Sequence, residues 1–520
     1  MSAIHDSAAK VELKGFFGHP RGLSTLFFTE MWERFSYYGM RAILILYMTA
    51  AVANGGLGWD PSFAGPIFGL YASSVYFLPL IGGWIADRFI GAYRATFIGG
   101  VIIMLGHFSL AVPTTTFFYL GLILVAVGTG FLKSNISAMV GDLYTKEDER
   151  RDAGFSIFYM GINIGALVAP FVCGFLAQAP AFRSILTSWG LDPNSSWHWG
   201  FAAAGVGMGL GLIQYIVGKR HLERVGEPPD KQARDEAGNL ANEMSRAYIV
   251  QIVGVTVAAV VIVAGSAYVY GTDFALSYVL MPVVLVAGLL GVLLTGMQDK
   301  LTVADWKRLG VITVLFAFST IFWMGFEQAA TSLNLFAEKL TEKTLFGWEF
   351  EASYLQAANP FLIILLAPVF AWLWVFLGKR QPTDAVKFAF GLFFAGLGFV
   401  VIAYAASFTD AGPVTFWWLI LVYLFHTIGE LCLSPVGLSS MTKLAPGRMV
   451  SLMLGVWFLS ISMGNYFAGM IAGEFEKKAS VLTGIFTNVA TILIVAAVVL
   501  FAISPLVKKL YLRSSEDVGQ

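Results

Sequence analysis

Charged residues and cysteines are both scarce in this chain. Asp, Glu, Lys and Arg make up 13% of its 520 residues, about half the share of an average soluble domain. Acidic and basic residues number 33 each, so the formal net charge is zero and nothing indicates binding to nucleic acid. The two cysteines, Cys173 and Cys432, both lie in apolar runs and indicate neither a disulfide framework nor a metal site.

Sequence motifs of common enzymes are absent as well. No HExxH, paired CxxC or nucleophile-elbow motif occurs within the apolar runs. The chain is therefore predicted not to be an enzyme and to need no cofactor. Its opening residues 1–21 are mixed polar and lack the basic-then-apolar pattern of a signal peptide, which indicates a cytosolic tail.

Long apolar runs, by contrast, are abundant. Hydrophobic residues make up 57% of the chain and the mean hydropathy is +0.72. A helix needs about 20 apolar residues to cross a bilayer, so the sequence predicts an all-α integral membrane protein with the lipid bilayer as its surroundings. Fourteen spans are expected, near 22–53, 62–88, 93–112, 115–143, 153–178, 197–218, 248–271, 276–297, 308–337, 351–378, 385–408, 415–443, 449–474 and 482–509.

Lysine and arginine alternate between the loops. "NGGLGWDPS", "VPTTTF" and "SFTDAGP" contain neither residue, whereas "DRFIGAYR", "TKEDERR", "GKRQPTDAVK" and "TKLAPGR" are basic. Basic loops stay on the cytosolic side, so both termini are expected in the cytosol. Two loops expected on the outer side, "EKLTEKTLFGWEFEAS" and "GEFEKKAS", nevertheless contain lysine. They slightly weaken the prediction of this orientation.

One long polar stretch divides the chain into two sets of spans. The pair of spans that follows it contains no Lys, Arg or Glu, as expected of a lipid-exposed accessory pair; Asp273 marks its turn. The predicted organisation is a cytosolic tail (1–21), a six-helix bundle (22–218), a cytosolic linker (219–247), an inserted helix pair (248–297), a second six-helix bundle (298–511) and a cytosolic tail (512–520).

Ionisable residues occur inside a few of the spans at a regular interval. Each charge near the centre of a membrane helix costs roughly 2.5–3.5 kcal/mol, and such residues usually face a bundle interior or a watery cavity. If the inserted pair is left out and the other twelve spans are numbered in order, the ionisable residues lie on every third span. The first span carries Glu30, Glu33, Arg34 and Arg41, the fourth Lys133, the seventh Glu327 and the tenth Glu430. This interval predicts nested three-helix repeats around a central cavity, the arrangement of a major-facilitator fold.

The charges of the first span share one side of a helix. At 100° per residue, about a third of the circumference holds Glu30, Glu33, Arg34, Tyr37 and Arg41. The remaining face, with Ile43, Leu44 and Leu46, can meet lipid or neighbouring helices. A purely structural ion-pair cluster is the alternative interpretation, although buried pairs seldom add net stability over apolar packing.

Such a cluster suits proton coupling. A carboxylate beside an arginine stays ionised, and it takes up a proton more readily when the arginine binds another anion. Glu30 and Glu33 are therefore candidate proton sites controlled by Arg34. Lys133 and the arginines could bind the carboxylate of a substrate and Glu430 its ammonium group, which suits a short peptide or an amino acid.

Seven motifs carry a resemblance to a known family: "EMWERFSYYG" (30–39), "GGWIADRFIGAYR" (82–94), "GFLKSNIS" (130–137), "FSIFYMGINIGALVAP" (155–170), "FWMGFEQ" (322–328), "NPFLIILLAP" (359–368) and "GELCLSPVGLS" (429–439). The chain resembles, over nearly its whole length, the proton-coupled oligopeptide transporter family of the major facilitator superfamily. The resemblance implies two six-helix bundles plus an inserted helix pair.

The resemblance also implies roles for individual residues. It assigns proton coupling to Glu30, Glu33, Arg34 and Glu327, and gating to the pairs Arg41–Glu327 and Lys133–Glu430. Peptide binding is implied for Arg34, Tyr38, Arg41, Tyr76, Lys133, Asn163, Trp323, Asn359, Glu430, Trp457 and Ser460. Each aromatic residue among them could instead serve packing alone.

Two departures from the family pattern limit which residues can take part in proton coupling. The second span contains no histidine such as animal members have, and Phe326 stands where some members have a second acid. The inserted pair is typical of bacterial members. The sequence therefore predicts a proton-coupled symporter that imports di- and tripeptides across a bacterial inner membrane by alternating access. A carrier of another cargo, such as nitrate or an amino acid, and a membrane enzyme or sensor are the alternatives, and the oligomeric state is left open.

Overall fold

The computed structural model describes residues 15–145, 148–228, 246–271, 274–298, 301–445 and 449–516. Four predicted features fall partly or wholly outside these residues: the start of the first tail (1–14), most of the linker (229–245), the turn with Asp273, and the end of the last tail (517–520). The predicted borders of the bundles, the linker and the tails remain predictions.

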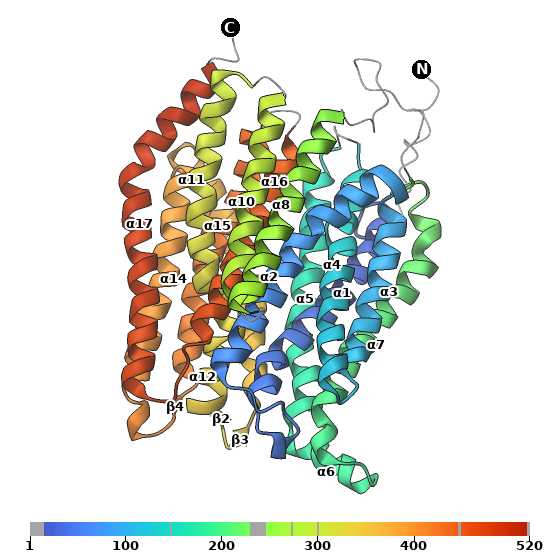
Figure 1. Ribbon diagram of the computed structural model, residues 1–520, viewed down its shortest axis with the longest axis vertical. Coiled ribbons are helices and arrows are strands. Elements are labelled where there is room, and N and C mark those ends of the chain that lie inside the picture. The colour runs from blue at the N-terminus through green and yellow to red at the C-terminus, as the bar shows by residue number, and fades with distance from the viewer. Residues whose placement is uncertain are drawn as a thin grey trace. The chain divides into compact units, whose positions relative to one another are not determined.

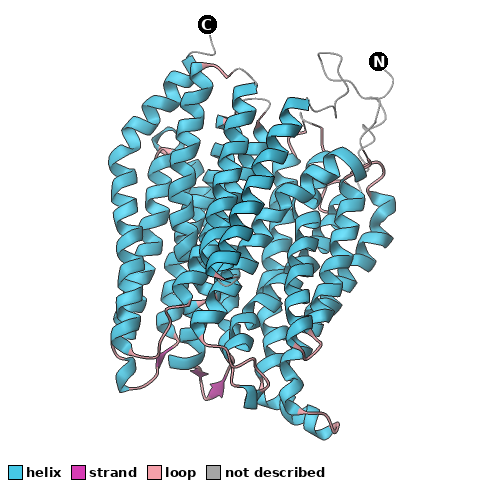
Figure 2. Ribbon diagram, viewed as in Figure 1, coloured by secondary structure: helices cyan, strands magenta, loops and turns pink. Residues whose placement is uncertain are grey.

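Helices make up nearly all of the described chain (Figures 1 and 2). The long helices are α1 (Arg21–Thr49), α2 (Pro61–Ile85), α3 (Ala92–Leu110), α4 (Thr115–Asp142), α5 (Arg151–Gln178), α7 (Ser196–Gly218), α8 (Arg246–Tyr270), α10 (Leu280–Gln298), α11 (Val303–Phe326), α13 (Ala358–Leu377), α14 (Asp384–Ala406), α15 (Trp417–Leu444), α16 (Val450–Ala472) and α17 (Ala479–Glu516). Two shorter helices are α6 (Pro180–Ser188) and α12 (Ser332–Leu340).

Within the described residues, strands are confined to four pieces of two residues each. β1 (Thr341–Glu342) pairs in parallel with β4 (Val414–Thr415), and β2 (Thr344–Leu345) pairs antiparallel with β3 (Trp348–Glu349). The described chain is thus all-α in architecture, as the apolar runs predict.

Twelve helices of the described chain are long and apolar enough to cross a membrane. Helix α1 is not among them because it carries five charged side chains, yet its 29 residues would measure about 43 Å at 1.5 Å per residue. Helix α10 is not among them either. The predicted count of fourteen spans therefore stays a prediction, while the multi-pass character is clear.

The chain divides into two compact units. Unit 1 is formed by the described residues of Met1–Met40 and Leu78–Ala241, and unit 2 by those of Arg41–Phe77 and Asn242–Gln520. In unit 1, α3 packs against α4 and α7, and in unit 2, α14 packs against α15 and α17 (Figure 1). The apolar core of unit 1 joins α1, α3, α4, α5 and α7 through Leu23, Leu26, Ile103, Leu132, Ile136, Met139, Phe158, Met208, Leu212 and Tyr215.

Within unit 2, α2 and α16 touch through glycine. A methyl group at Gly69 would lie 2.9 Å from the Cα of Gly469, and one at Gly469 would lie 2.4 Å from the Cα of Gly69. Side chains are thus excluded from both positions, and the two backbones meet directly. Close contact between small residues is a usual way for membrane helices to associate.

The span predicted over 308–337 contains a break. Helix α11 ends at Phe326, a 3₁₀ turn covers Glu327–Ala330, and α12 starts at Ser332. Between them, Thr331 adopts φ −120° and ψ −101°, outside the helical region. Polar side chains in this segment offer the backbone alternative hydrogen bonds, whereas hydropathy alone gives no sign of the interruption.

Candidate functional site

The charged residues at the centre of α1 form one buried cluster in unit 1. Nε of Arg34 lies 3.0 Å from Oε1 of Glu30 and 2.5 Å from Oε2 of Glu33. All three side chains are almost inaccessible, with Glu33 at 0% exposure. The guanidinium carbon also lies 5.5 Å from the centroid of the Tyr37 ring, within the range of a cation–π contact. One buried arginine is therefore shared by two buried carboxylates.

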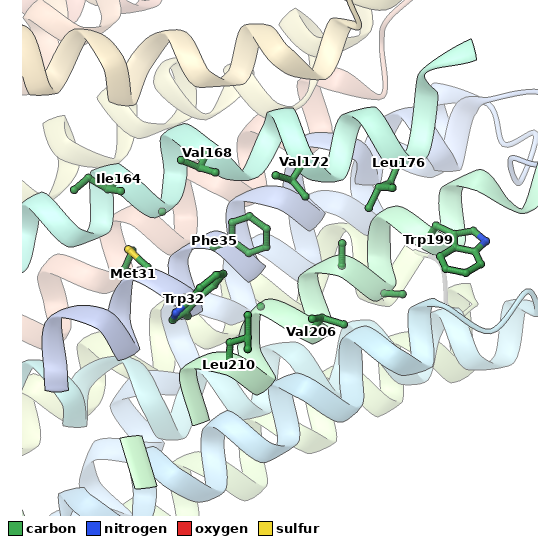
Figure 3. Close-up of a pocket in the computed structure, with 14 residues that line it drawn as sticks. Met31, Trp32, Phe35, Ile164, Val168, Val172, Leu176, Trp199, Val206 and Leu210 are labelled. Carbon is green, nitrogen blue, oxygen red and sulfur yellow. The ribbon is translucent and has the colours of Figure 1, made fainter. Parts of the chain in front are cut away.

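The opposite side of α1 is apolar. Met31, Trp32 and Phe35 help to line a pocket of about 520 Å³ together with residues of α5 and α7 (Figure 3). The lining contains no charged residue; its labelled members on the other two helices are Ile164, Val168, Val172, Leu176, Trp199, Val206 and Leu210. Apolar and charged residues are thus separated around the helix, and this pocket does not suit a charged ligand.

A glycine brings α5 against the cluster. A methyl group at Gly165 would lie 2.2 Å from the carbonyl oxygen of Met31 and 3.2 Å from Cβ of Arg34. Only glycine fits there, so the two backbones meet beside the arginine. Asn163, two residues earlier on α5, is 5% exposed, and its amide donates to the carbonyl of Tyr159 at 3.0 Å.

Two further predicted residues lie near this cluster in unit 1. Lys133 on α4 is half-buried and close enough to Glu30 to interact with it electrostatically. The ring of Tyr38 packs edge-to-face against Tyr37, with centroids 5.2 Å apart. Unit 1 therefore combines two acids, two bases and aromatic rings from α1 and α4.

Unit 2 contains an ion pair between residues that are far apart in sequence. Nη2 of Arg41 on α1 contacts Oε2 of Glu327 at the end of α11, and both side chains are buried. Close by, the amide of Asn334 on α12 donates to the carbonyl of Ala42 at 2.9 Å. Asn334 was not among the predicted site residues. The polar residues that interrupt "FEQAATSLN" after an apolar run were the available signal.

A second polar group of unit 2 lies between α13 and α15. Asn359 donates from Nδ2 to Oε2 of Glu430 at 3.0 Å and to Oγ1 of Thr427 at 3.0 Å. Thr427 itself donates to the carbonyl of Tyr423, one turn earlier on α15. The asparagine therefore holds the Glu430 carboxylate in a defined position. Thr427 was not expected, but it lies three residues before Glu430, on a neighbouring face of a helix.

The remaining predicted residues of unit 2 are buried among packing partners. Trp457 lies 6.3 Å from the ring of Phe388, and Trp323 lies 5.2 Å from that of Phe326. Ser460 shares a 2.8 Å hydrogen bond with Ser319 of α11. Tyr76 on α2 is also buried, at 8% exposure. These contacts agree with packing as well as with a pocket-lining role, so their binding role stays a prediction.

The predicted residues are thus divided between the units. Glu30, Glu33 and Arg34 lie together in unit 1, as do Arg41 with Glu327 and Asn359 with Glu430 in unit 2. The predicted pair Lys133–Glu430 joins residues of different units and stays a prediction. Within the described ranges, no group of three or more His, Cys, Asp or Glu side chains could hold a metal ion.

Comparison with known proteins decides the family. The sequence profile described as "PTR2: POT family" matches residues 93–489. The chain belongs to the POT family. It is 37% identical to the peptide transporter YePEPT of Yersinia enterocolitica over 511 residues, which cover 95% of this chain and 96% of the relative. It is also 36% identical over 509 residues to a di-/tripeptide transporter of Lactococcus lactis subsp. cremoris, covering 95% and 97% of the two chains.

A solved structure of a POT-family relative fixes the fold. The crystal structure of a peptide transporter in complex with alafosfalin superposes with a TM-score of 0.82 at 40% identity, covering 97% of this chain and 98% of the relative. This similarity confirms the predicted all-α membrane architecture of the major-facilitator type. The chain is a multi-pass membrane transporter of the POT family.

Proposed function

We propose that this POT-family member is a proton-coupled symporter that imports di- and tripeptides by alternating access. The observation that supports it most is the buried arginine, Arg34, shared by the carboxylates of Glu30 and Glu33. Relatives at 36–37% identity that are described as peptide and di-/tripeptide transporters, and the relative crystallised with alafosfalin, support the same cargo class.

Coupling follows from competition for one cation. A peptide carboxylate that binds Arg34 takes it from Glu30 and Glu33, and two buried carboxylates left beside each other would not both stay ionised. One of them then takes up a proton, which travels with the peptide. A proton moving down the membrane potential supplies about 2.3 kcal/mol per 100 mV, enough to drive uphill import of a neutral peptide.

Recognition of the two peptide termini requires charges of both signs. We assign the carboxylate terminus to Arg34, Arg41 and Lys133. We assign the amino terminus to Glu430, with Asn163 and Asn359 as hydrogen-bond partners. The carboxylate of Glu430 is already oriented by Asn359 at 3.0 Å. Main-chain termini are common to all short peptides, so such a site would accept many side chains. The aromatic and hydroxyl residues Tyr38, Tyr76, Trp323, Trp457 and Ser460 would line its remainder.

Alternating access would use ion pairs that break in turn. The buried pair Arg41–Glu327 and the predicted pair Lys133–Glu430 are the candidates. Pro435 lies inside α15 and removes one backbone hydrogen bond, which permits α15 to bend near Glu430. We place the protein in a bacterial inner membrane with both termini in the cytosol, on the basis of the basic loops.

Reconstitution tests the proposal directly. Proteoliposomes that contain only this protein should accumulate labelled dialanine when an inward proton gradient is imposed, and should merely equilibrate it without one. Excess unlabelled tripeptide should compete, whereas nitrate or free alanine should not. Absence of any uptake would favour a sensor, and competition by alanine or nitrate in place of peptides would favour the other carriers.

A further inference from the structure

The turn that carries Glu327 is held by a residue with no assigned role. Gln328 is fully buried and follows Glu327, the C-cap residue of α11. We propose that Gln328 is a positioning residue that fixes Glu327 toward Arg41 and ties this ion pair to α16. The inference rests on the proposed role of the Arg41–Glu327 pair.

The side chain of Gln328 makes four hydrogen bonds. Its amide Nε2 donates to the carbonyl of Met324 at 3.3 Å, one turn back on α11, and to that of Ala468 on α16 at 3.4 Å. Its Oε1 accepts from the hydroxyls of Ser332 at 2.5 Å and of Thr331 at 3.3 Å. Both donors and both acceptor positions of the amide are therefore occupied, which defines its orientation.

These hydrogen bonds supply partners for backbone and side-chain polar groups at the break between α11 and α12. The last carbonyls of a helix have no intrahelical donor, and a bilayer interior offers no water to replace it. Gln328 supplies a donor for α11 and, through Ser332, joins the start of α12 to the same amide. A second glutamine holds the turn from another side, since Gln356 donates to the carbonyl of Ala329 at 2.6 Å.

The consequence concerns coupling rather than stability alone. Glu327 is the first residue of the 3₁₀ turn Glu327–Ala330, so the direction of its side chain depends on the path of that turn. Since Gln328 links this turn to Ala468 of α16, a displacement of α16 would change the position of the Glu327 side chain. A residue that merely filled space would not transmit it.

The test compares Gln328→Met, which keeps the length of the side chain but not its bonds, with Ser332→Ala, which removes one bond. In proteoliposomes, uptake of dialanine driven by a proton gradient should fall about tenfold in Gln328→Met, and about threefold in Ser332→Ala, in line with the usual loss of a buried hydrogen bond. Counterflow of dialanine without a gradient should stay close to that of the unaltered protein in both, because peptide binding is left intact.

Asn465→Ala is the matched control. Asn465 is a buried amide on α16 that donates to the carbonyl of Ile461 in its own helix, so its loss should change uptake and counterflow by the same factor. If Gln328→Met does not fold, Ser332→Ala decides alone. An unchanged ratio of uptake to counterflow in the folded variants would overturn the inference.

A double-mutant cycle separates this role from a general structural one. In a Glu327→Gln background, the added Gln328→Met change should leave gradient-driven uptake within about twofold of Glu327→Gln alone, because residues that act as a unit are not additive. Losses that multiply would show that Gln328 acts independently of Glu327. The unaltered protein is measured separately. If it fails to accumulate dialanine under a proton gradient, that result counts against the proposed function and not against the role of Gln328.

Discussion

The two units hold their buried charges in different ways. In unit 1, the cluster of Glu30, Glu33 and Arg34 lies within five consecutive residues of one helix. In unit 2, Arg41 and Glu327 are 286 positions apart, and Asn359 and Glu430 are 71 apart. A local cluster can exchange partners without moving its helix, whereas a long-range pair must separate two helices when it breaks. The first arrangement suits proton exchange, and the second suits gating.

The largest expected effect would break the local cluster. Glu33→Gln should abolish uptake of dialanine driven by a proton gradient and spare counterflow, because the amide cannot exchange a proton while peptide binding to Arg34 remains possible. Both modes are measured in the same proteoliposomes. The exposed Glu223→Gln serves as the control and should behave like the unaltered protein. Gradient-driven accumulation that persists in Glu33→Gln would remove Glu33 from coupling.

The next effect tests the long-range ion pair. Arg41→Met alone leaves the Glu327 carboxylate buried without its partner, which should lower the free energy of unfolding in detergent by about 3–5 kcal/mol. The double variant Arg41→Met with Glu327→Leu should recover most of the lost free energy of unfolding, because no unpaired charge stays buried. Arg308→Met, which removes a loose pair with Asp305 at 3.8 Å, should cost at most about 1 kcal/mol. Equal losses in the single and double variants would mean that the pair contributes no coupling.

A smaller effect concerns recognition in unit 2. Glu430→Ala should weaken competition by dipeptides with a free amino terminus about tenfold or more, the range for a lost charge-assisted hydrogen bond. N-acetylated dipeptides, which present no ammonium group, should be far less affected. Competition against labelled dialanine measures both. A loss of the same size for the two ligand types would show that Glu430 does not bind the ammonium group.

The smallest effect lies at a helix end of unit 1, where a long-range contact does occur. Nδ1 of His19 lies 2.9 Å from the hydroxyl of Tyr144, and Arg150 donates to the carbonyl of Gly18 at 3.1 Å. Burial, followed by the nearby Arg150, lowers the pKa of His19, while Asp148 opposes this. Hydrogen bonds from Arg150 lower the pKa of Asp148 to about 2, so Asp148 stays ionised above pH 5.

The segment Phe16–His19 packs on Tyr144 and Arg150 through these contacts. Because the pKa of His19 is lowered there, the packed segment binds fewer protons than the same segment when it is released. Its docking should therefore be constant above pH 6.5, the ordinary pKa of His19, and weaken as the pH falls below that value. Amide hydrogen exchange at Phe16–His19 should rise a few-fold at pH 5.5 relative to pH 7.5, after correction for the intrinsic rate. In His19→Gln the change should disappear; its persistence would assign the pH dependence to another group.

Local features of the site could be predicted from sequence because they depend on helical geometry alone. Spacing of three and four residues places Glu30, Glu33 and Arg34 on one face, and the structure has them in contact. Ile43, Leu44 and Leu46, for which lipid and helix contact were both open, are buried against the protein. Composition likewise predicts an all-α membrane protein.

Long-range features could not be derived in this way. Nothing in the spacing of residues links Arg41 to Glu327; that pairing came from resemblance to a family. The break after α11 was missed because hydropathy averages over the polar residues at 327–334, among them Gln328 and Asn334. Side-chain hydrogen bonds join this segment to α1 and α16, and a single sequence does not specify such partners.

The glycine contact between α2 and α16 has a mechanical consequence. Where Gly69 meets Gly469, no side chain lies between the backbones that could change its rotamer and absorb a shift. Any sliding of one helix would have to carry the other with it or open a gap in the bilayer interior. The first part of α2 and the last turn of α16 are therefore expected to move together as one rigid element.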